Sequence, residues 1–192
     1  MKDTRIVVAM CGSFCTFGQV MPKLKELAAE GATLIPVMSQ NAYQLDTKFG
    51  QAEQWRTQLE EICSRKILST LQEVEPLGPK NMADMMLIAP CTGNTMAKLA
   101  AGSTDGAVTM AAESMLRAEK PVVIALSTND GLSAAARNIG DLLNRKHYYF
   151  LPFGQDDWKN KPRSLQADFD KLHQTLEKAK QGVQIQPLLT EK

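Results

Sequence analysis

Four short polar segments of the chain carry the side chains best suited to holding an anion. They span residues 11–16, 39–42, 90–95 and 127–131, and each joins an apolar run to a stretch with helical spacing. Hydroxyls, amides and the free N–H groups at helix N-termini are the donors that bind phosphates and carboxylates. One such segment would indicate little, because Ser, Thr, Asn and Asp are also ordinary helix N-caps. Four of them predict a site for a small anionic ligand.

The predicted site residues come from all four segments. Asn94 and Thr95, at the start of an expected helix, are the candidates for a catalytic role. The residues expected to bind the ligand or a cofactor are Gly12, Ser13, Thr16, Ser39, Asn41, Pro90, Thr92, Gly93 and Asn129. No spacing singles out a residue for proton transfer. The eligible carboxylates are Glu75, Asp84, Asp105 and Asp130.

Several common kinds of site are not predicted. Segment 11–16 matches neither the G-x-G-x-x-G dinucleotide fingerprint nor the G-x-x-x-x-G-K-[ST] phosphate loop. The two histidines, His147 and His173, fit no nucleophile–histidine–acid order. Cys11 and Cys15 lack a second pair that would complete a zinc site, so we predict no metal. We expect the four cysteines to be small, buried apolar side chains.

Apolar runs that end at the polar segments predict the strands. Strands are expected at residues 5–10, 33–38, 84–89 and 121–126, with a short aromatic strand at 148–151. Pro36 predicts an edge position for the second strand, because proline cannot donate a hydrogen bond to a neighbour. Pro90 is expected to end the third strand.

Apolar residues at helical spacing predict the helices between the strands. They are expected at residues 20–30, 55–63, 94–101, 107–118, 134–144 and 165–179. Pro22 must lie in the first turn of the first helix or kink it. The Ala- and Met-rich helix at 107–118 could pack against the sheet or against another subunit.

Alternation of strands and helices predicts crossover connections, and hence a doubly wound, mainly parallel sheet. The expected fold is a three-layer α/β sandwich of the Rossmann-like class, in one domain over residues 1–192 with a C-terminal tail at 182–192. In such sheets ligands bind beyond the carboxyl ends of the strands, so the polar turns should converge on one crevice. The turns concerned lie around Ser13, Asn41, Asn94 and Asn129.

The composition narrows the classes of partner. Lys and Arg number 22 and Asp and Glu 21, so the chain lacks the basic excess of a nucleic-acid-binding protein. No apolar run approaches the roughly 18 residues of a membrane span, and the apolar stretch near Met1 is too short for a signal peptide. We expect a cytoplasmic protein that binds neither nucleic acid nor membrane.

Residues 89–100, Ala-Pro-Cys-Thr-Gly-Asn-Thr-Met-Ala-Lys-Leu-Ala, resemble the signature loop and helix of the flavoprotein family. That family contains homo-oligomeric flavin-containing cysteine decarboxylases and flavin prenyltransferases. Residues 10–13 and 37–42 resemble its first and second phosphate-gripping turns, and the similarity is collinear over roughly residues 5–126. The resemblance implies a flavoprotein-like fold, an FMN site and an oligomer.

The chain departs from the family pattern at two places. Pro76 stands where the decarboxylases have a catalytic histidine, and residues 76–84 contain no histidine. Cysteine decarboxylation is therefore not implied. Cys91-Thr92-Gly93 replaces Ala-Ser-Ala in the signature, which changes the wall of the site and leaves open whether FMN is bound.

Residues 75–80, 127–130 and 152–157 resemble a narrower family, the B subunits of dipicolinate synthases. This implies a two-subunit enzyme whose A subunit is similar to dehydrogenases and carries NAD(P). Its small dicarboxylate substrate would be a dihydro or hydroxytetrahydro intermediate of the lysine pathway, converted to pyridine-2,6-dicarboxylate in the mother cell during sporulation. The alternatives are an assembly or binding subunit without catalysis, and a stand-alone FMN-dependent flavoprotein.

A dicarboxylate needs cations or N–H donors to replace its hydration. Besides the site residues, the candidates are Lys159, Lys161 and Arg163. Lys98, one turn after Asn94, could steer a carboxylate or be an ordinary solvated lysine. The aromatic and charged stretch before Lys159 could contact a partner subunit or form a surface loop.

Overall fold

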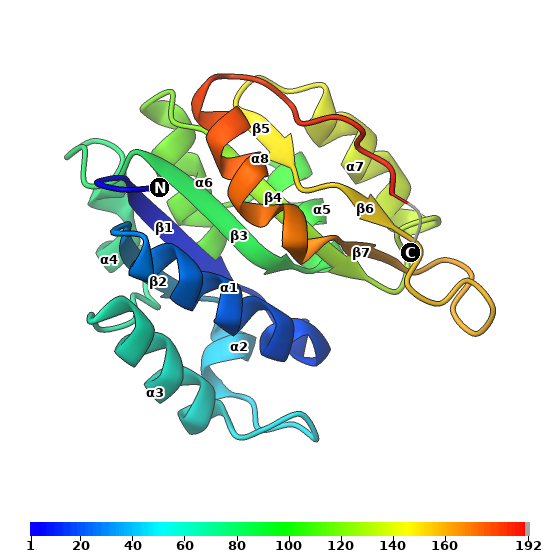
Figure 1. Ribbon diagram of the computed structural model, residues 1–192, viewed down its shortest axis with the longest axis horizontal. Helices are drawn as coiled ribbons and strands as arrows, with labels where there is room; N and C mark the ends of the chain where they lie inside the picture. Colours follow the sequence, from blue (N-terminus) through cyan, green and yellow to red (C-terminus); the bar gives the residue numbers. More distant parts are fainter. Residues whose placement is uncertain (191–192) are drawn as a thin grey trace.

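The computed structural model of the chain describes residues 1–190, in which seven strands form one mixed sheet (Figure 1). The strands are β1 (Arg5–Met10), β2 (Thr33–Met38), β3 (Met85–Cys91), β4 (Val122–Thr128), β5 (Tyr148–Phe150), β6 (Phe153–Gly154) and β7 (Leu165–Ala167). Their order is β2-β1-β3-β4-β7-β6, with β5 beside the first half of β4. Strands β1 to β5 are parallel, whereas β7 is antiparallel to β4 and β6.

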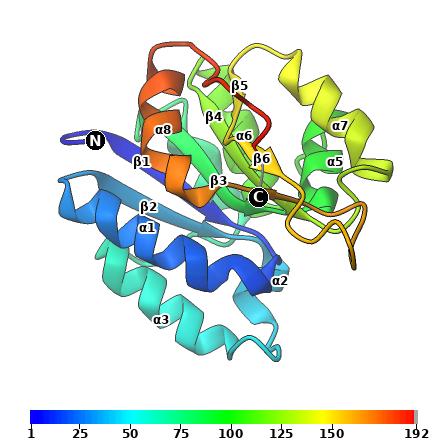
Figure 2. The same ribbon diagram turned by 45° about the vertical axis from the view of Figure 1, so that its right-hand side comes forward.

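Helices cover both faces of this sheet, as the turned view also shows (Figure 2). One face carries α1 (Phe17–Ala29), α3 (Ala52–Cys63) and α8 (Leu172–Lys180). The other carries α5 (Gly93–Ala101), α6 (Ala107–Arg117) and α7 (Ala134–Leu143). Two short helices, α2 (Gln40–Gln44) and α4 (Leu71–Val74), complete the connections. The predicted three-layer α/β sandwich is confirmed.

The side chains of each strand alternate between the two core layers. In β1, Ile6 and Val8 pack toward α1, and Val7 and Ala9 pack toward α6. Helix α6 buries its apolar side against the sheet, since Ala111 and Met115 are fully covered. Among residues 1–190, no helix combines the length and the apolar character needed to cross a bilayer.

The second strand lies at the edge of the sheet, as Pro36 predicts. On its outer side the Pro36 carbonyl accepts a hydrogen bond of 2.9 Å from the Leu68 N–H. The missing N–H of Pro36 removes no hydrogen bond between full strands, because among the described residues β1 is the only full strand beside β2.

Several predicted boundaries are wrong. Leu165 to Ala167 form β7 and not the start of a helix, which begins only at Leu172. Strand β3 continues through Pro90 to Cys91, with a shift of register against β4 after Ile88. Pro22 lies inside α1 and not in its first turn, because the helix starts earlier than expected, at the fully buried Phe17.

Candidate functional site

The four polar segments follow four neighbouring strands, so they share one edge of the sheet. They enclose two adjoining cavities, of about 330 Å³ and about 220 Å³, which share Gly12 and Thr92 in their walls. Asn41 and Asn94 line the first cavity, whereas Ser13 and Asn129 line the second. The predicted single crevice is thus divided into two.

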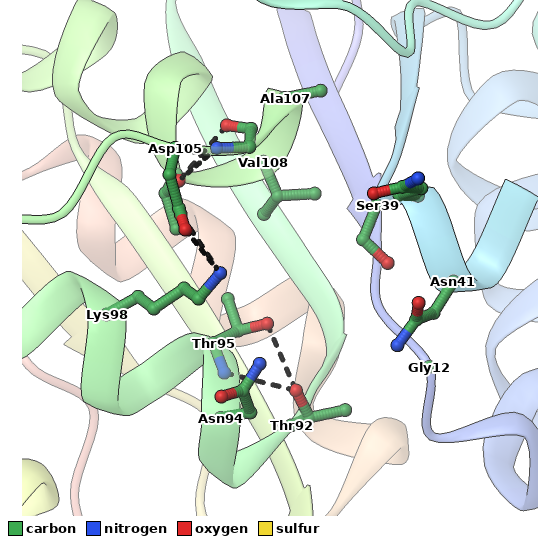
Figure 3. A pocket seen from close by; sticks show the side chains of 13 residues that line it. Gly12, Ser39, Asn41, Thr92, Asn94, Thr95, Lys98, Asp105, Ala107 and Val108 are labelled. Carbon is green, nitrogen blue, oxygen red and sulfur yellow. Dashed lines mark hydrogen bonds and ion pairs between the residues drawn. The ribbon is translucent and has the colours of Figure 1, made fainter.

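The first cavity lies between two sets of side chains that face each other (Figure 3). Ser39 and Asn41 stand on one side, from the start of α2, and Thr92 and Asn94 on the other, from the start of α5. The Thr92 hydroxyl caps α5, accepting a hydrogen bond of 3.2 Å from the Thr95 N–H. Polar groups on both sides make this cavity suited to an anionic or strongly hydrogen-bonding ligand.

Helix α6 also begins at the first cavity. Its N-cap is Gly106, which has no side chain to cap the first N–H groups. The Thr109 hydroxyl donates a hydrogen bond to the Gly106 carbonyl at 3.0 Å and accepts one from the Gly106 N–H at 3.3 Å. The first turns of α5 and α6 therefore direct the positive ends of two helix dipoles toward the same space.

One ion pair lies in the wall of the first cavity. The Lys98 ammonium contacts both carboxylate oxygens of Asp105, at 3.0 and 2.8 Å (Figure 3). The hydrogen bond from Lys98 lowers the pKa of the Asp105 carboxyl. Lys98 therefore lines the first cavity in an ion pair and does not extend alone into solvent.

The second cavity is lined by hydroxyls and closed by the loop before β7. Ser13 and Ser127 share a hydrogen bond of 2.8 Å between their hydroxyls. From the loop, Lys161 lies 3.8 Å from Asp156, and the Ser164 hydroxyl donates to the same carboxylate. This cavity is therefore polar but carries its own paired charges.

Gly93, in the wall of the second cavity, allows two polar side chains to approach the start of α5 closely. The Thr128 hydroxyl donates a hydrogen bond to the Asp130 carboxylate. A Cβ on residue 93 would lie 2.7 Å from the Thr128 hydroxyl and 2.8 Å from an Asp130 carboxylate oxygen. Real Cβ atoms do not come that close, so the pair of side chains depends on glycine at this position.

Two predicted site residues line neither cavity. Thr16 is 2% exposed, and its hydroxyl donates to the Ser13 carbonyl at 2.8 Å, so it shapes the turn that holds Ser13. Pro90 is buried inside β3. Of the loop before β7, Lys161 was among the predicted candidates and does line the second cavity, whereas Asp156, Ser164 and the start of α6 were missed. The glycine that opens α6 was a local signal, but the contribution of the loop depends on tertiary packing.

Neither histidine lies at these cavities. The His147 carbonyl accepts a hydrogen bond from Val122 at the opposite, amino end of β4. His173 on α8 contacts Glu30 at 2.8 Å. Within residues 1–190, no group of three His, Cys, Asp or Glu side chains is placed to hold a metal ion.

The cysteines divide into three buried and one exposed. Cys11, Cys63 and Cys91 are buried as expected, whereas Cys15 is exposed and lines the second cavity, so the prediction is wrong for Cys15. Burial raises the pKa of the Cys63 thiol to about 12. A hydrogen bond from Cys91 lowers the pKa of Cys11, and desolvation raises that of Cys91.

The segment from β6 into the loop before β7 combines a buried and an exposed aromatic residue. Phe153 is buried in β6, and Trp158 is 60% exposed with the Lys159 ammonium 5.3 Å from its ring centre. The loop also contacts the start of α7, since the Leu132 N–H donates to the Arg163 carbonyl at 2.9 Å. An exposed tryptophan therefore lies in the same loop as Asp156 and Lys161 of the second cavity.

A family model, a relative of known sequence and two solved structures all resemble this chain over most of its length. The model of the family described as Flavoprotein matches residues 1–154. The B subunit of the Bacillus subtilis dipicolinate synthase is 42% identical over 191 residues, which cover 100% of this chain and 96% of that protein. The crystal structure of the B subunit of the Bacillus halodurans dipicolinate synthase superposes with a TM-score of 0.91 at 40% identity, covering 100% of this chain and 98% of that one. An FMN-dependent cysteine decarboxylase shares the fold, with a TM-score of 0.69 at 23% identity over 92% of this chain and 97% of the other.

Proposed function

The chain belongs to the flavoprotein family, and from that premise we propose that it is the B subunit of a dipicolinate synthase. One observation carries the proposal. The family similarity ends at residue 154, but the second cavity is completed by Asp156, Lys161, Ser164 and Gln166, which lie beyond it. The similarity to the B subunits extends over these residues as well.

In this proposal the reaction takes a dihydro or hydroxytetrahydro pyridine dicarboxylate to pyridine-2,6-dicarboxylate. The hydroxylated ring loses water, and the resulting dihydro ring loses two hydrogens, one as hydride to NAD(P)⁺ on a dehydrogenase-like A subunit and one as a proton. The chain would act in the cytoplasm of the mother cell during sporulation. The hetero-oligomer is needed because the hydride acceptor belongs to the partner.

The residues of this chain would bind and orient the dicarboxylate. Asn94 and Thr95 lie at the start of α5 in the first cavity, where N–H groups and an amide can hold a carboxylate. Asn129 and Ser13 offer an amide and a hydroxyl in the adjoining second cavity. Fixing both ends of the ring would orient the position from which hydride leaves toward the nicotinamide.

In the alternative of a stand-alone flavoprotein, the first cavity would hold part of FMN in place of the dicarboxylate. Hydroxyl and amide groups of Ser39, Asn41 and Asn94, together with the N–H groups opening α6, suit a phosphate and a ribityl chain. Ala107 and Val108 offer the apolar wall that a ring system would need. Bound FMN would supply a two-electron acceptor. The absorption spectrum of freshly purified protein tests this part, because bound flavin gives the protein a yellow colour.

The main test is a rate measurement with both subunits. Nicotinamide reduction is followed after the lysine-pathway intermediate is supplied to the A subunit alone, to this chain alone and to the two together. We expect reduction at full rate only with both. An A subunit that reaches the same rate alone would contradict the proposal.

A purely assembling subunit is the second candidate, favoured by the lack of a histidine at either cavity. Asn94→Ala separates the two, because Asn94 is exposed at the mouth of the site and its loss should leave the fold intact. A catalytic subunit predicts a fall in kcat/KM of about tenfold or more with the complex still formed. An assembling subunit predicts an unchanged rate.

A further inference from the structure

We propose that Lys98 is the cationic anchor of a carboxylate subsite in the first cavity, with Asp105 as the counter-ion that a bound carboxylate displaces. The ligand class, a pyridine carboxylic acid, rests on the proposed function. The role of Lys98 does not follow from that function, which requires only that some group in the two cavities holds the acid.

The position of Lys98 follows from the helix that carries it. Asn94 and Lys98 are four residues apart on α5, so both side chains project from the same face of the helix. That face forms a wall of the first cavity (Figure 3). The ammonium is held beside Asp105, near the start of α6, and not extended into solvent.

The charges of the cavity single out this lysine. Among the 13 residues that the structure places around the first cavity, only Lys98 and Asp105 are charged. The wall is therefore neutral while the two are paired, and Lys98 is the one side chain there that can neutralise an entering carboxylate. The other polar groups there are amides, hydroxyls and the N–H groups of two helix starts, which donate to a carboxylate but carry no net charge.

Asp105 is well placed to be displaced. Its side chain is 58% exposed and that of Lys98 is 37% exposed, and exposed ion pairs contribute little net stability. A ligand carboxylate could make the same contacts with Lys98 and in addition accept from Asn94 and from the first N–H groups of α6. The Asp105 carboxylate would then turn to solvent, where its charge is hydrated.

The test is calorimetric titration of the purified chain with pyridine-2,6-dicarboxylate, pyridine-2-carboxylate and inorganic phosphate in metal-free buffer. The variants are Lys98→Met, which keeps the aliphatic stem, Lys98→Arg, which keeps the charge, and Asp105→Asn. Lys66→Met is the matched control, because Lys66 forms an ion pair of the same 2.8 Å length with Glu60 but lines neither cavity.

We expect Lys98→Met to raise the Kd of the dicarboxylate about ten- to a hundredfold, as loss of a charge-assisted hydrogen bond does. Lys98→Arg, which keeps the charge, should lose less affinity than Lys98→Met, and Asp105→Asn should lower the Kd, because it removes the competitor of the ligand. Lys66→Met should change nothing. The wild-type Kd should also rise with salt.

Several results would overturn the inference. The first is a Lys98→Met chain that binds the dicarboxylate as wild type does, and the second is an Asp105→Asn chain that binds it more weakly. The others are a loss of affinity in Lys98→Met that is seen only with phosphate, and a wild-type chain that binds no dicarboxylate. The outcome is independent of the synthase test. Binding that depends on Lys98 together with an inactive two-subunit complex would refute the proposed function alone, and an active complex with Lys98-independent binding would refute this inference alone.

Discussion

At the scale of single residues, the second cavity depends on the missing side chain of Gly93. The Thr128 and Asp130 side chains occupy the space that a Cβ on residue 93 would fill. The sequence shows that a small residue has replaced an alanine of the family pattern, but it does not show which groups use the space. Those groups come from the segment after β4, which only the folded sheet brings beside the segment after β3.

Gly93→Ala is therefore expected to push the Thr128 and Asp130 side chains away from residue 93, and with Thr128 to change the wall of the second cavity. Overpacking of this kind costs about 1–3 kcal/mol of the free energy of unfolding, and synthase activity with the partner should fall by about tenfold or more. Urea unfolding and steady-state rates measure the two effects. Gly140→Ala is the control, because nothing lies within 4 Å of its Cβ position and the substitution is in α7. Equal activity of both variants would show that the Thr128–Asp130 pair is not needed.

The cysteines allow a second test at the residue scale. Of the four cysteines, Cys15 alone is exposed. Burial raises the pKa of Cys63 to about 12, so the Cys63 thiol stays protonated at neutral pH. Because the thiolate is the reactive form, an aromatic disulfide reagent at about pH 8 should label one thiol quickly and the other three only after unfolding. Release of the coloured thiolate counts the reacting groups. Cys15→Ser should abolish the fast phase, and a fast phase that persists would contradict the burial of the others.

At the scale of elements, the strands that precede the polar segments could be predicted from the sequence, but the last third of the sheet could not. Continuous apolar runs such as 5–10 and 121–126 have one plausible structure, a strand buried on both faces. Leu165 is spaced like a helical residue relative to Phe169 and Leu172, yet it lies in β7. A run of three residues fits either period, and its pairing with β4 decides the outcome.

The same limit applies to the candidate site. Segment positions follow from strand order, so the four polar loops could be predicted to share one edge. Their division into two cavities could not, because it depends on the directions of the side chains and on the loop before β7. Thr16 illustrates this, since a hydroxyl predicted to bind a ligand instead bonds to the Ser13 carbonyl.

The starts of β1 and β3 are joined by a contact that should give a pH-dependent stability. Asp84 accepts hydrogen bonds from the Arg5 side chain at 2.6 and 3.2 Å and from its backbone N–H at 2.8 Å. The Arg5 hydrogen bond holds the pKa of Asp84 below its usual value. A carboxyl whose pKa is lowered by folding stabilises the protein above its unfolded pKa, about 3.9, and loses that contribution as the pH falls through the folded value.

Asp84→Asn should therefore lower the free energy of unfolding by about 1 kcal/mol at pH 7, and the difference from wild type should shrink below about pH 4. Urea unfolding at several pH values measures the difference. Glu119→Gln is the control, because Glu119 and Lys146 are each 78% exposed and lie 3.7 Å apart. A difference that stays constant down to about pH 3 would mean that the charge of Asp84 is not the source of the stability.

At the scale of the whole molecule, the proposed reaction requires a partner to reach the cavities. Hydride transfer needs the nicotinamide of the A subunit in contact with the bound ring, so the partner must cover the carboxyl edge of the sheet. The loop before β7 borders the second cavity and presents Trp158, which is 60% exposed. Large aromatic side chains of this kind often carry much of the affinity of an interface.

Trp158→Ala is expected to weaken binding of the A subunit by about tenfold or more, because an aromatic anchor at an interface contributes on the order of 2 kcal/mol or more. Sedimentation or surface-based binding measures the Kd, and circular dichroism checks that the fold is intact. Val183→Ala is the matched control, since Val183 is 48% exposed beyond the end of α8 and borders neither cavity. If Trp158→Ala binds the partner as tightly as Val183→Ala does, the partner approaches the cavities from the side of α2 and α6, and the loop is an ordinary surface feature.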